Sequence, residues 1–356
     1  MKVAVLGAGN GGQAISAYLS LQGHSVSLYH HKQAKVDTLL ARGKKIRLMG
    51  KLEGEAELCC ISTDLAQVVN GADVIMVTTT ANAHSVLATQ LASILVDNQI
   101  ILLNPGRTGG TLEVLQVLMK SGCTSNVYVA EAQTLVYACR IVEDGLVNII
   151  GIKDKVLISS DSSSRTSYVL SKVKKLYSCF EAAENIIRTS LENIGAIFHP
   201  CVLLFNAATI ERQTDFWFYR DMTPAIADFI EAFDRERLAV GKAYGIELLS
   251  VREWISYAYP ETKGNTLCEK MINNPAYYAI KSPSTIFTRQ LTEDIPTGVL
   301  PIVELGKAVG VDVPLMDSMI NICSALLQID FRKNGRTLEN LGLSNLTKEE
   351  ILTKFS

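Results

Sequence analysis

Two groups of residues have the types and spacing needed for ligand binding or catalysis. The first is a glycine-rich loop. The loop, "GAGNGG", places Gly7, Gly9 and Gly12 in a G-x-G-x-x-G arrangement, with Asn10 and Gly11 in the same turn. In this pattern the first glycine permits a tight turn and the second lets the backbone approach a pyrophosphate. The third lets a helix pack closely, with its free N–H groups aimed at the phosphates. The spacing therefore predicts a dinucleotide-binding loop.

The stretch "YHHK" bears on which dinucleotide binds. About 20 residues after such a loop an Asp or Glu usually accepts hydrogen bonds from the ribose, but this chain has His30, His31 and Lys32. A carboxylate would repel a 2′-phosphate, whereas Lys32 and a protonatable His30 or His31 could bind one. We therefore predict NADPH as the cofactor over NADH. The alternative is that these are exposed loop residues and either cofactor is accepted, because Arg, the more usual phosphate partner, is absent.

The second group surrounds His199, which lies in "ENIGAIFHPCVLLFNAA". Reduction of a C=O or C=N bond needs a proton donor, and histidine is suited to that role near neutral pH. The segment "TRQLTEDIPTGVLP" adds Arg289, which could bind a substrate carboxylate. It also adds Asp294, which could fix the tautomer of a histidine and favour its imidazolium form. The plainer alternatives are a hydrogen-bonded core histidine and an ion pair within a surface segment.

The elements that must position these residues are strands and helices in the first half of the chain and helices in the second half. Strands are expected at "KVAVLG", "HSVSLYH", "AELCCIS", "ADVIMVTT", "NQIILLN" and "NVYVAEA". Helical patterns separate several of them, which predicts βαβ crossovers and a mostly parallel sheet. "LVNIIGIKDKVLISS" predicts two closely joined strands that extend the sheet. From about Thr189 the pattern is helical, beginning with "LENIGAIFHPCVLLFNAATIER", while Pro296 and Gly298 argue against a long helix near Asp294.

The fold class that follows is α/β, with an N-terminal Rossmann-type dinucleotide-binding domain and a C-terminal all-helical domain. We place the first domain at residues 1–186 and the second at residues 187–356. The strand, glycine loop, helix and second strand come in the order that dinucleotide binding requires. That order disfavours the alternative of a glycine-rich turn without a ligand.

Composition excludes several classes of function. The 356 residues are 48% hydrophobic and carry a net charge of -2, so no basic surplus indicates binding to nucleic acid or acidic membranes. The eight cysteines are scattered without C-x-x-C or Cys/His spacing, which predicts reduced thiols and no metal site. No signal peptide and no apolar run near ~18 residues are present. The sequence thus predicts a soluble, cytoplasmic protein without a membrane segment.

Several longer motifs together carry a family resemblance over nearly the whole chain. They are "VLGAGNGGQA", "LNPGRTGG", "HPCVLLFNAA", "NNPAYYAIKSP", "TRQLTEDIPTGVLPIVELGKAVGV" and "DFRKNGRTLENLGLSNLT". With them the chain resembles the opine dehydrogenase family, the octopine and nopaline dehydrogenase group. Within it, the chain looks most like the bacterial branch that acts on N-(1-carboxyethyl) amino acids. The glycine loop is shared with many dehydrogenases, whereas the C-terminal segments are specific to this family.

The resemblance implies NAD(P)H-dependent reductive condensation of an α-keto acid, commonly pyruvate, with the amino group of an amino acid. An imine forms and is reduced to a secondary amine dicarboxylate, in a cleft between the two domains. By this resemblance His199 is the catalytic acid/base and Asp294 orients and charges it. Arg289, five residues before Asp294 as in the family motif, holds a substrate carboxylate. A homodimer fits the resemblance, although no stretch of the sequence marks an interface.

Two loops are expected to line the nicotinamide and keto acid end. They are "NPGRTGG", which supplies Asn104 to the cofactor, and "AEAQT", which supplies Thr134 to the substrate. Both follow predicted strands, and ligands of open α/β sheets lie beyond the carboxyl ends of the strands. Arg107 either touches cofactor or substrate, or belongs to the surface.

Some questions stay open at the level of the sequence. The bacterial branch carries an acidic residue where this chain has His30, which puts NADH preference in doubt.

"DFWFYRDM" could line the amino acid pocket through Trp217, Tyr219 and Arg220, although such aromatic density more often indicates packing. The alternative functions are a ketopantoate- or glycerol-3-phosphate-type reductase, and a nucleotide-sensing protein without turnover. The former use a lysine as the main catalytic group, and the latter would not need all of His199, Arg289 and Asp294.

Overall fold

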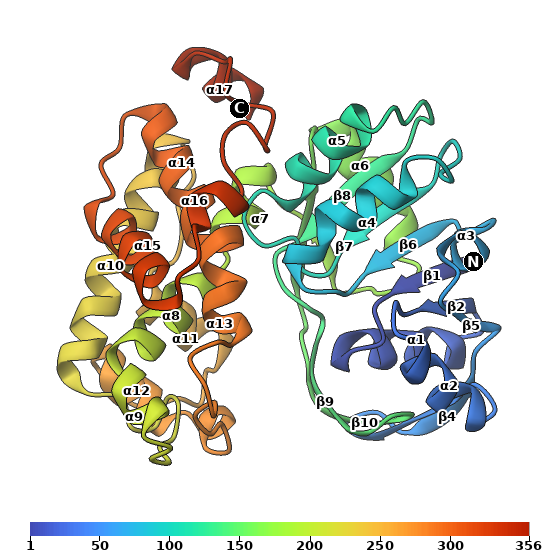
Figure 1. The fold of residues 1–356 in the computed structure, drawn as a ribbon, viewed down its shortest axis with the longest axis horizontal. Coiled ribbons are helices and arrows are strands. Elements are labelled where there is room, and N and C mark those ends of the chain that lie inside the picture. The colour runs from blue at the N-terminus through green and yellow to red at the C-terminus, as the bar shows by residue number, and fades with distance from the viewer. Residues whose placement is uncertain (356) are drawn as a thin grey trace. The chain divides into compact units, whose positions relative to one another are not determined.

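In the computed structural model, which describes residues 1–355, the chain divides into two units, Met1–Ser190 and Leu191–Ser356. The first unit is built on β-sheets with helices on both faces, and the second is built from helices (Figure 1). The predicted fold class, an α/β domain followed by a helical domain, is confirmed.

Eight strands form the main sheet of the first unit, in the order β12-β11-β8-β7-β6-β1-β2-β5. They are β1 (Lys2–Leu6), β2 (Ser25–Tyr29), β5 (Cys60–Ser62), β6 (Val74–Val77), β7 (Ile100–Leu103), β8 (Tyr128–Ala132), β11 (Val156–Ser160) and β12 (Phe180–Ala182). Neighbouring strands are parallel except for the antiparallel pair β8 and β11. Because β1 lies between β2 and β6, the direction of strand addition reverses there. Open α/β sheets bind ligands at such a reversal, beyond the carboxyl ends of the strands.

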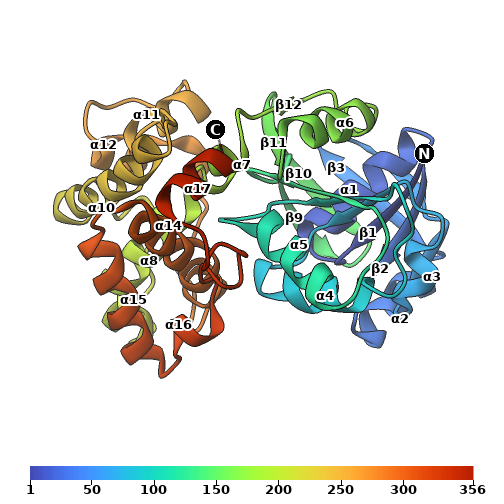
Figure 2. The same ribbon diagram turned by 90° about the horizontal axis from the view of Figure 1, so that it is seen from above.

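Helices cover both faces of this sheet. They are α1 (Asn10–Leu21), α2 (Gln33–Ala41), α3 (Leu65–Val69), α4 (His84–Leu91), α5 (Gly110–Lys120) and α6 (Ser163–Val173), with a 3-10 turn at Ala81–Ala83. Helix α7 (Ile186–Leu191) follows at the boundary between the two units. Helices α1, α2 and α6 contribute to one core cluster, and α3, α4 and α5 contribute to another. Figure 2 shows α1 and α6 on the side of the main sheet opposite α4 and α5.

A second, four-stranded sheet was only partly expected from the sequence. Its order is β4-β3-β10-β9, with β3 (Lys45–Gly50), β4 (Gly54–Glu57), β9 (Tyr137–Glu143) and β10 (Leu146–Ile152). "AELCCIS" was predicted as one strand but is divided between β4 and β5, which belong to different sheets. The two closely joined strands predicted in "LVNIIGIKDKVLISS" are β10 and β11, but only β11 extends the main sheet. β10 instead pairs with β3, which lies about a hundred residues earlier in the chain.

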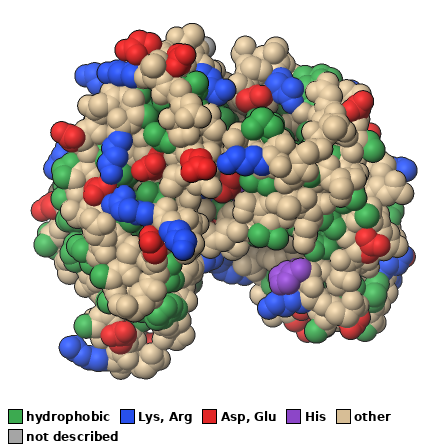
Figure 3. All heavy atoms as spheres, turned by 45° about the horizontal axis from the view of Figure 1, so that its top comes forward, with side chains coloured by type: hydrophobic (Ala, Val, Ile, Leu, Met, Phe, Trp, Pro, Cys, Tyr) green, Lys and Arg blue, Asp and Glu red, His purple; other side chains and the backbone are tan. Residues whose placement is uncertain are grey.

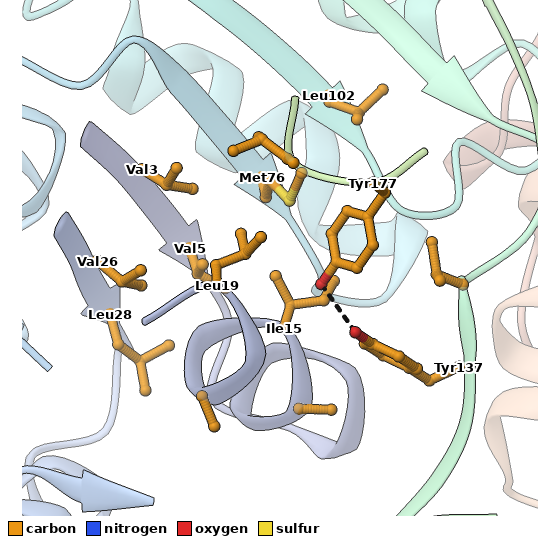
Figure 4. Packing of buried hydrophobic residues seen from close by; sticks show 14 of the residues in the cluster. Val3, Val5, Ile15, Leu19, Val26, Leu28, Met76, Leu102, Tyr137 and Tyr177 are labelled. Atoms are coloured by element: carbon orange, nitrogen blue, oxygen red, sulfur yellow. Dashed lines mark hydrogen bonds between the residues drawn. The ribbon is translucent and has the colours of Figure 1, made fainter. Parts of the chain in front are cut away.

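The core of the first unit explains why α1 lies where it does. Ile15 and Leu19 of α1 are fully buried against Val5, Leu28 and other strand residues (Figure 4). Burial of each such side chain contributes roughly 1.5–3 kcal/mol to folding. The helix that begins in the glycine loop is therefore fixed along its length by the sheet.

Up to residue 355, the second unit consists of helices with one isolated β-bridge. Its elements are α8 (Gly195–Phe205), α9 (Ala207–Glu211), α10 (Pro224–Ala243), α11 (Val251–Ala258), α12 (Leu267–Asn273), a 3-10 turn at Pro275–Tyr277, α13 (Arg289–Thr292), a π-helical turn at Ile295–Val299, α14 (Leu300–Val309), α15 (Pro314–Leu327), α16 (Phe331–Asn334) and α17 (Lys348–Lys354). The long helix predicted in "LENIGAIFHPCVLLFNAATIER" is broken between α8 and α9 at Asn206. The Asn206 side chain donates to the backbone carbonyl of Val202 (2.9 Å). Such local bonds compete with helix continuation.

The segment around Asp294 has no long α-helix, as Pro296 and Gly298 predicted. Helix α13 ends at Thr292, and a π-helical turn then leads into α14. Pro296 stands near the start of that turn, where its missing N–H costs little. Single π-helical turns are frequent at functional sites.

The surface carries charges of both signs. Lys and Arg side chains are interspersed with Asp and Glu over the face seen in Figure 3, in keeping with the net charge of -2. No helix within residues 1–355 is long and apolar enough to cross a membrane.

Candidate active site

The glycine loop follows β1 directly and leads into α1. Gly7 has φ +114°, a conformation that L side chains rarely adopt, and its N–H donates to the carbonyl of Tyr29 (2.9 Å). A Cβ on Gly12 would lie 1.6 Å from the carbonyl oxygen of Gly7, so only glycine fits there. These contacts are the tight turn and the close helix packing that the sequence predicts for Gly7 and Gly12.

The same loop leaves room for a ligand over Gly9. No protein atom lies within 4 Å of a Cβ built on Gly9, which is the N-cap residue of α1 and has no side chain with which to cap the helix. The first N–H groups of a helix without a capping side chain can donate to phosphate oxygens. The residues present therefore fit a dinucleotide pyrophosphate.

Asn10 and Gly11 have protein partners within the first unit. The Asn10 Oδ1 atom accepts a hydrogen bond from the Ile141 N–H of β9 (2.8 Å). A Cβ on Gly11 would lie 2.9 Å from Cδ2 of Leu135, so Gly11 allows that side chain to pack on the loop. Asn10 thus joins the loop to the small sheet, and Gly11 joins it to the segment just before β9; sequence reasoning did not foresee either contact.

The end of β2 places His30, His31 and Lys32 beside one another. The rings of His30 and His31 stack with centroids 4.7 Å apart, and His30 Nδ1 accepts the backbone N–H of Lys32 (3.1 Å). Burial, followed by the nearby charges of His31, Lys35 and Lys32, lowers the pKa of His30. His30 is therefore a neutral donor through Nε2 at pH 7, and the exposed Lys32 is the better candidate for the cation that the sequence predicts.

Unpaired polar atoms mark the carboxyl ends of β6 and β7. Asn104, at the end of β7, is 3% exposed, and its Nδ2 donates to the Leu102 carbonyl (2.9 Å). Its Oδ1 is buried and has no hydrogen-bond partner within residues 1–355, and the same is true of the Thr79 hydroxyl after β6. Buried polar atoms without partners are costly and call for an explanation. A cofactor at this edge of the sheet would provide their partners.

Thr79 was missed by sequence reasoning. The polar run "TTT" directly after a buried strand was the available signal. Thr134, predicted to touch the substrate, is half-buried in the turn after β8.

A buried carboxylate fixes the loop that contains Asn104, and this residue too was not foreseen. Glu131 of β8 has no exposed surface, and its Oε2 accepts the N–H of Thr111 (2.9 Å). Its Oε1 accepts the hydroxyls of Thr189 and Ser190, both at 2.8 Å. The Ser190 hydroxyl in turn accepts the Gly109 N–H (3.0 Å). The loop between β7 and α5 is thereby anchored to the C-terminal half of α7.

In the helical unit, His199 and Asp294 are hydrogen-bonded although 95 residues separate them. The His199 Nδ1 atom lies 2.5 Å from Asp294 Oδ2. The side chain of Asp294 is 1% exposed and that of His199 is 20% exposed. The approach depends on small residues, because a Cβ on Gly298 would lie 2.6 Å from Cβ of Ala196, one turn before His199. Ala196 and Gly298 therefore let α8 and the π-helical turn come together.

The hydrogen bond determines which nitrogen of His199 can react. An ionised carboxylate only accepts, so Nδ1 carries a proton and Nε2 is the atom left to exchange protons with a ligand. Arg289, the first residue of α13, keeps 57% of its side chain exposed, and its Nη1 lies 3.4 Å from Glu293 Oε2. Its remaining donors can bind a carboxylate.

The "DFWFYRDM" segment divides into packing and surface residues. Phe218 is buried and its ring centroid lies 6.1 Å from that of His199. Tyr219 packs on Tyr277 at 4.4 Å. The Arg220 guanidinium lies over the ring of Trp217, 5.1 Å from its centroid. Phe218 therefore lies beside His199, and Tyr219 is near enough to Asp294 and Arg289 for their charges to act on its hydroxyl.

Within residues 1–355, no group of three or more His, Cys, Asp or Glu side chains is placed to hold a metal ion.

Comparisons with known proteins identify families that match both parts of the chain. Residues 182–327 match the family model described as the NAD/NADP octopine/nopaline dehydrogenase alpha-helical domain. Residues 2–130 match the NAD-dependent glycerol-3-phosphate dehydrogenase N-terminus. An opine dehydrogenase from Arthrobacter sp. (strain 1C) is 37% identical over 349 residues, which cover 98% of this chain and 97% of the relative.

Solved structures show the same fold. An octopine dehydrogenase structure described with NADH and L-arginine gives a TM-score of 0.83 at 22% identity, covering 99% of this chain and 98% of the other. A yersinopine dehydrogenase structure with NADP+ bound gives a TM-score of 0.73 at 14% identity, covering 99% and 97%.

Proposed function

Because the chain belongs to the opine dehydrogenase family of NAD(P)-dependent oxidoreductases that act on CH–NH groups, we propose that it condenses pyruvate with an amino acid. The amino group adds to the keto carbon and water leaves, which gives an imine. Addition of a hydride and a proton then gives an N-(1-carboxyethyl) amino acid. The nicotinamide supplies the hydride when it is bound.

The observation that carries this proposal is the His199–Asp294 pair in the helical unit. Loss of water from the condensing carbon needs a proton on its oxygen, and a protonated Nε2 can deliver it. Asp294 holds Nδ1 and offsets the charge that the ring gains. Because Asp294 is buried, its carboxylate acts in a region of low dielectric, where charge interactions are strong.

Arg289 supplies the second part of the proposed site. Both substrates and the product carry carboxylates, and the exposed guanidinium begins the helix that ends just before Asp294. A bidentate pair with one carboxylate would orient the keto carbon toward His199. In the first unit we assign the cofactor to Gly7, Gly9, Gly12, Asn104 and Lys32, with Thr134 beside the substrate.

We propose NADPH as the preferred cofactor, and Lys32→Asp tests this. The change replaces the exposed cation with a group that repels a 2′-phosphate. The ratio of kcat/KM for NADPH to that for NADH is expected to fall about tenfold or more, because a hydrogen bond to a charged group is worth about 1.5–3 kcal/mol. Lys51→Asp, at another exposed lysine, makes the same charge change and should leave the ratio unaltered. An unchanged ratio in Lys32→Asp would show that Lys32 does not read the phosphate.

The reaction itself is tested by following absorbance as the purified protein oxidises NADPH or NADH. Each cofactor is supplied with pyruvate alone, then with pyruvate and one amino acid from a panel. Oxidation that needs both substrates supports imine reduction and identifies the amine. Oxidation with the keto acid alone would indicate a hydroxy acid dehydrogenase instead. Absence of oxidation combined with tight cofactor binding would indicate a sensor.

A cytoplasmic location is also proposed, and it is supported by the eight free cysteines, which suit a reducing compartment. A homodimer remains a prediction from the family resemblance, and light scattering on the purified protein tests it.

A further inference from the structure

The hairpin formed by β9 and β10, residues 137–152, contacts the start of α1 at several points. Ile141 donates its N–H to Asn10 Oδ1 (2.8 Å), and Gly145 donates its N–H to Oε1 of the fully buried Gln13 (2.9 Å). The Gln13 amide nitrogen donates in turn to the carbonyl of Ala8 (3.1 Å), inside the glycine loop. The hairpin is therefore hydrogen-bonded to the residues that shape the phosphate-binding turn.

A further contact comes from Leu135, two residues before the hairpin. The Leu135 side chain packs on Gly11, close enough that a Cβ there would lie 2.9 Å from Leu135 Cδ2. Leu135 is itself held by Lys153, the first residue after β10. The Lys153 Nζ donates to the Leu135 carbonyl (2.7 Å), and the Lys153 N–H donates to the Val136 carbonyl (2.9 Å). Lys153 thus ties the two ends of the hairpin together beneath the loop.

The environment of Lys153 disfavours the charged, protonated form of its amino group. Burial lowers the pKa of its ammonium group to about 8. The titratable groups that face it are Cys139 from β9 and Cys179 from the segment before β12, and burial raises the pKa of both thiols, that of Cys139 to about 11. Both thiols are neutral while Lys153 titrates. The negative charge of the nearby Asp154 carboxylate also raises the pKa of Cys179.

We propose that Lys153 is a positioning residue for the dinucleotide: its ammonium group, bound to the Leu135 carbonyl, holds the hairpin against the glycine loop. Lys153 can affect cofactor binding without touching the cofactor. It fixes the position of Leu135, and the Leu135 side chain packs on Gly11 of the loop. The charged form makes the stronger hydrogen bond. Cofactor affinity is therefore greatest below the pKa of Lys153 and declines as the pH rises through it. This inference rests on the proposed binding of NAD(P)H to the first unit.

The test is the dissociation constant of NADH, measured by fluorescence between pH 7 and pH 9.5, on the full-length chain and two variants. For the unaltered chain the dissociation constant is expected to rise about tenfold, and the rise should begin near pH 8. Lys153→Gln keeps an N–H donor without a titrating charge, so it should bind more weakly at pH 7 and show no step. Lys153→Met should bind about tenfold more weakly at pH 7, again without a step. The kcat at saturating substrates should change less than about twofold, which a general loss of structure would not allow.

Lys155→Gln is the matched control, because Lys155 is exposed and paired with Glu181 (2.6 Å). It should retain the step near pH 8. A flat profile for the unaltered chain, or a step that persists in Lys153→Gln, would overturn the inference. The latter result would assign the titration to a group other than Lys153. If Lys153→Met fails to fold, the first two profiles still decide the matter. If the unaltered chain binds neither NADH nor NADPH at any pH, the proposed function itself fails.

Discussion

Replacing His199 with alanine is expected to lower kcat about 10³-fold, because the group that donates the proton during condensation is lost. The dissociation constant of NADPH should stay within about twofold, since the glycine loop lies in the other unit of the chain. Steady-state oxidation of NADPH with pyruvate and the amine substrate measures the first quantity. Fluorescence titration measures the second.

Two companion variants make this result specific. Asp294→Asn preserves shape but removes the carboxylate that holds Nδ1–H, and should cost about 10²- to 10⁴-fold in kcat. His24→Ala removes a histidine from the first unit and should leave turnover intact. More than a tenth of normal kcat in His199→Ala would refute the proposed acid/base role, whatever the behaviour of Asp294→Asn.

The second large effect concerns alanine substitutions at two glycines of the loop. One is expected to lower folding stability and the other to weaken cofactor binding. Gly12→Ala forces a Cβ to within 1.6 Å of the Gly7 carbonyl oxygen, so the variant should lose about 3 kcal/mol or more of folding stability. Gly9→Ala meets no protein atom within 4 Å and should cost less than about 1 kcal/mol. Its methyl group would occupy the space over the loop and should weaken NADPH binding at least tenfold.

Thermal unfolding with and without NADPH separates these outcomes. Cofactor that binds only the native state raises the melting temperature, so NADPH should raise it for the unaltered chain. It should have little effect on Gly9→Ala, whose own melting temperature should be close to normal. A Gly9→Ala variant stabilised by NADPH as strongly as the unaltered chain would show that the pyrophosphate does not approach Gly9.

The first strand, glycine loop, helix and second strand could be predicted because each is specified by its own local sequence. Short apolar runs mark the strands, and β1 is buried along almost its whole length. Gly7 has a positive φ that L side chains rarely adopt, and Gly12 has no room for a Cβ. The small sheet could not be predicted in the same way. Its central pair, β3 and β10, joins segments about a hundred residues apart, and local periodicity does not report on pairing over that distance.

The candidate site likewise depends on contacts between distant segments, which local sequence does not report. His199 and Asp294 were brought together by a family resemblance, whereas the contact itself depends on Gly298 fitting against Ala196. The sequence "YHHK" offers Lys32 and two protonatable histidines as partners of a 2′-phosphate. Burial and the Lys32 N–H distinguish them, and both are properties of the folded chain.

The hydroxyls that bind Glu131 have a consequence for any attempt to produce the nucleotide-binding unit alone. A fragment that stops at residue 186 would contain the carboxylate but not Thr189 and Ser190, which both donate to its Oε1. A fully buried carboxylate that loses donors is strongly destabilising. A fragment that ends four residues later, at Ser190, keeps both hydroxyls together with the Ser190 contact to Gly109. The difference between an aggregating and a well-behaved fragment is therefore expected to depend on those four residues.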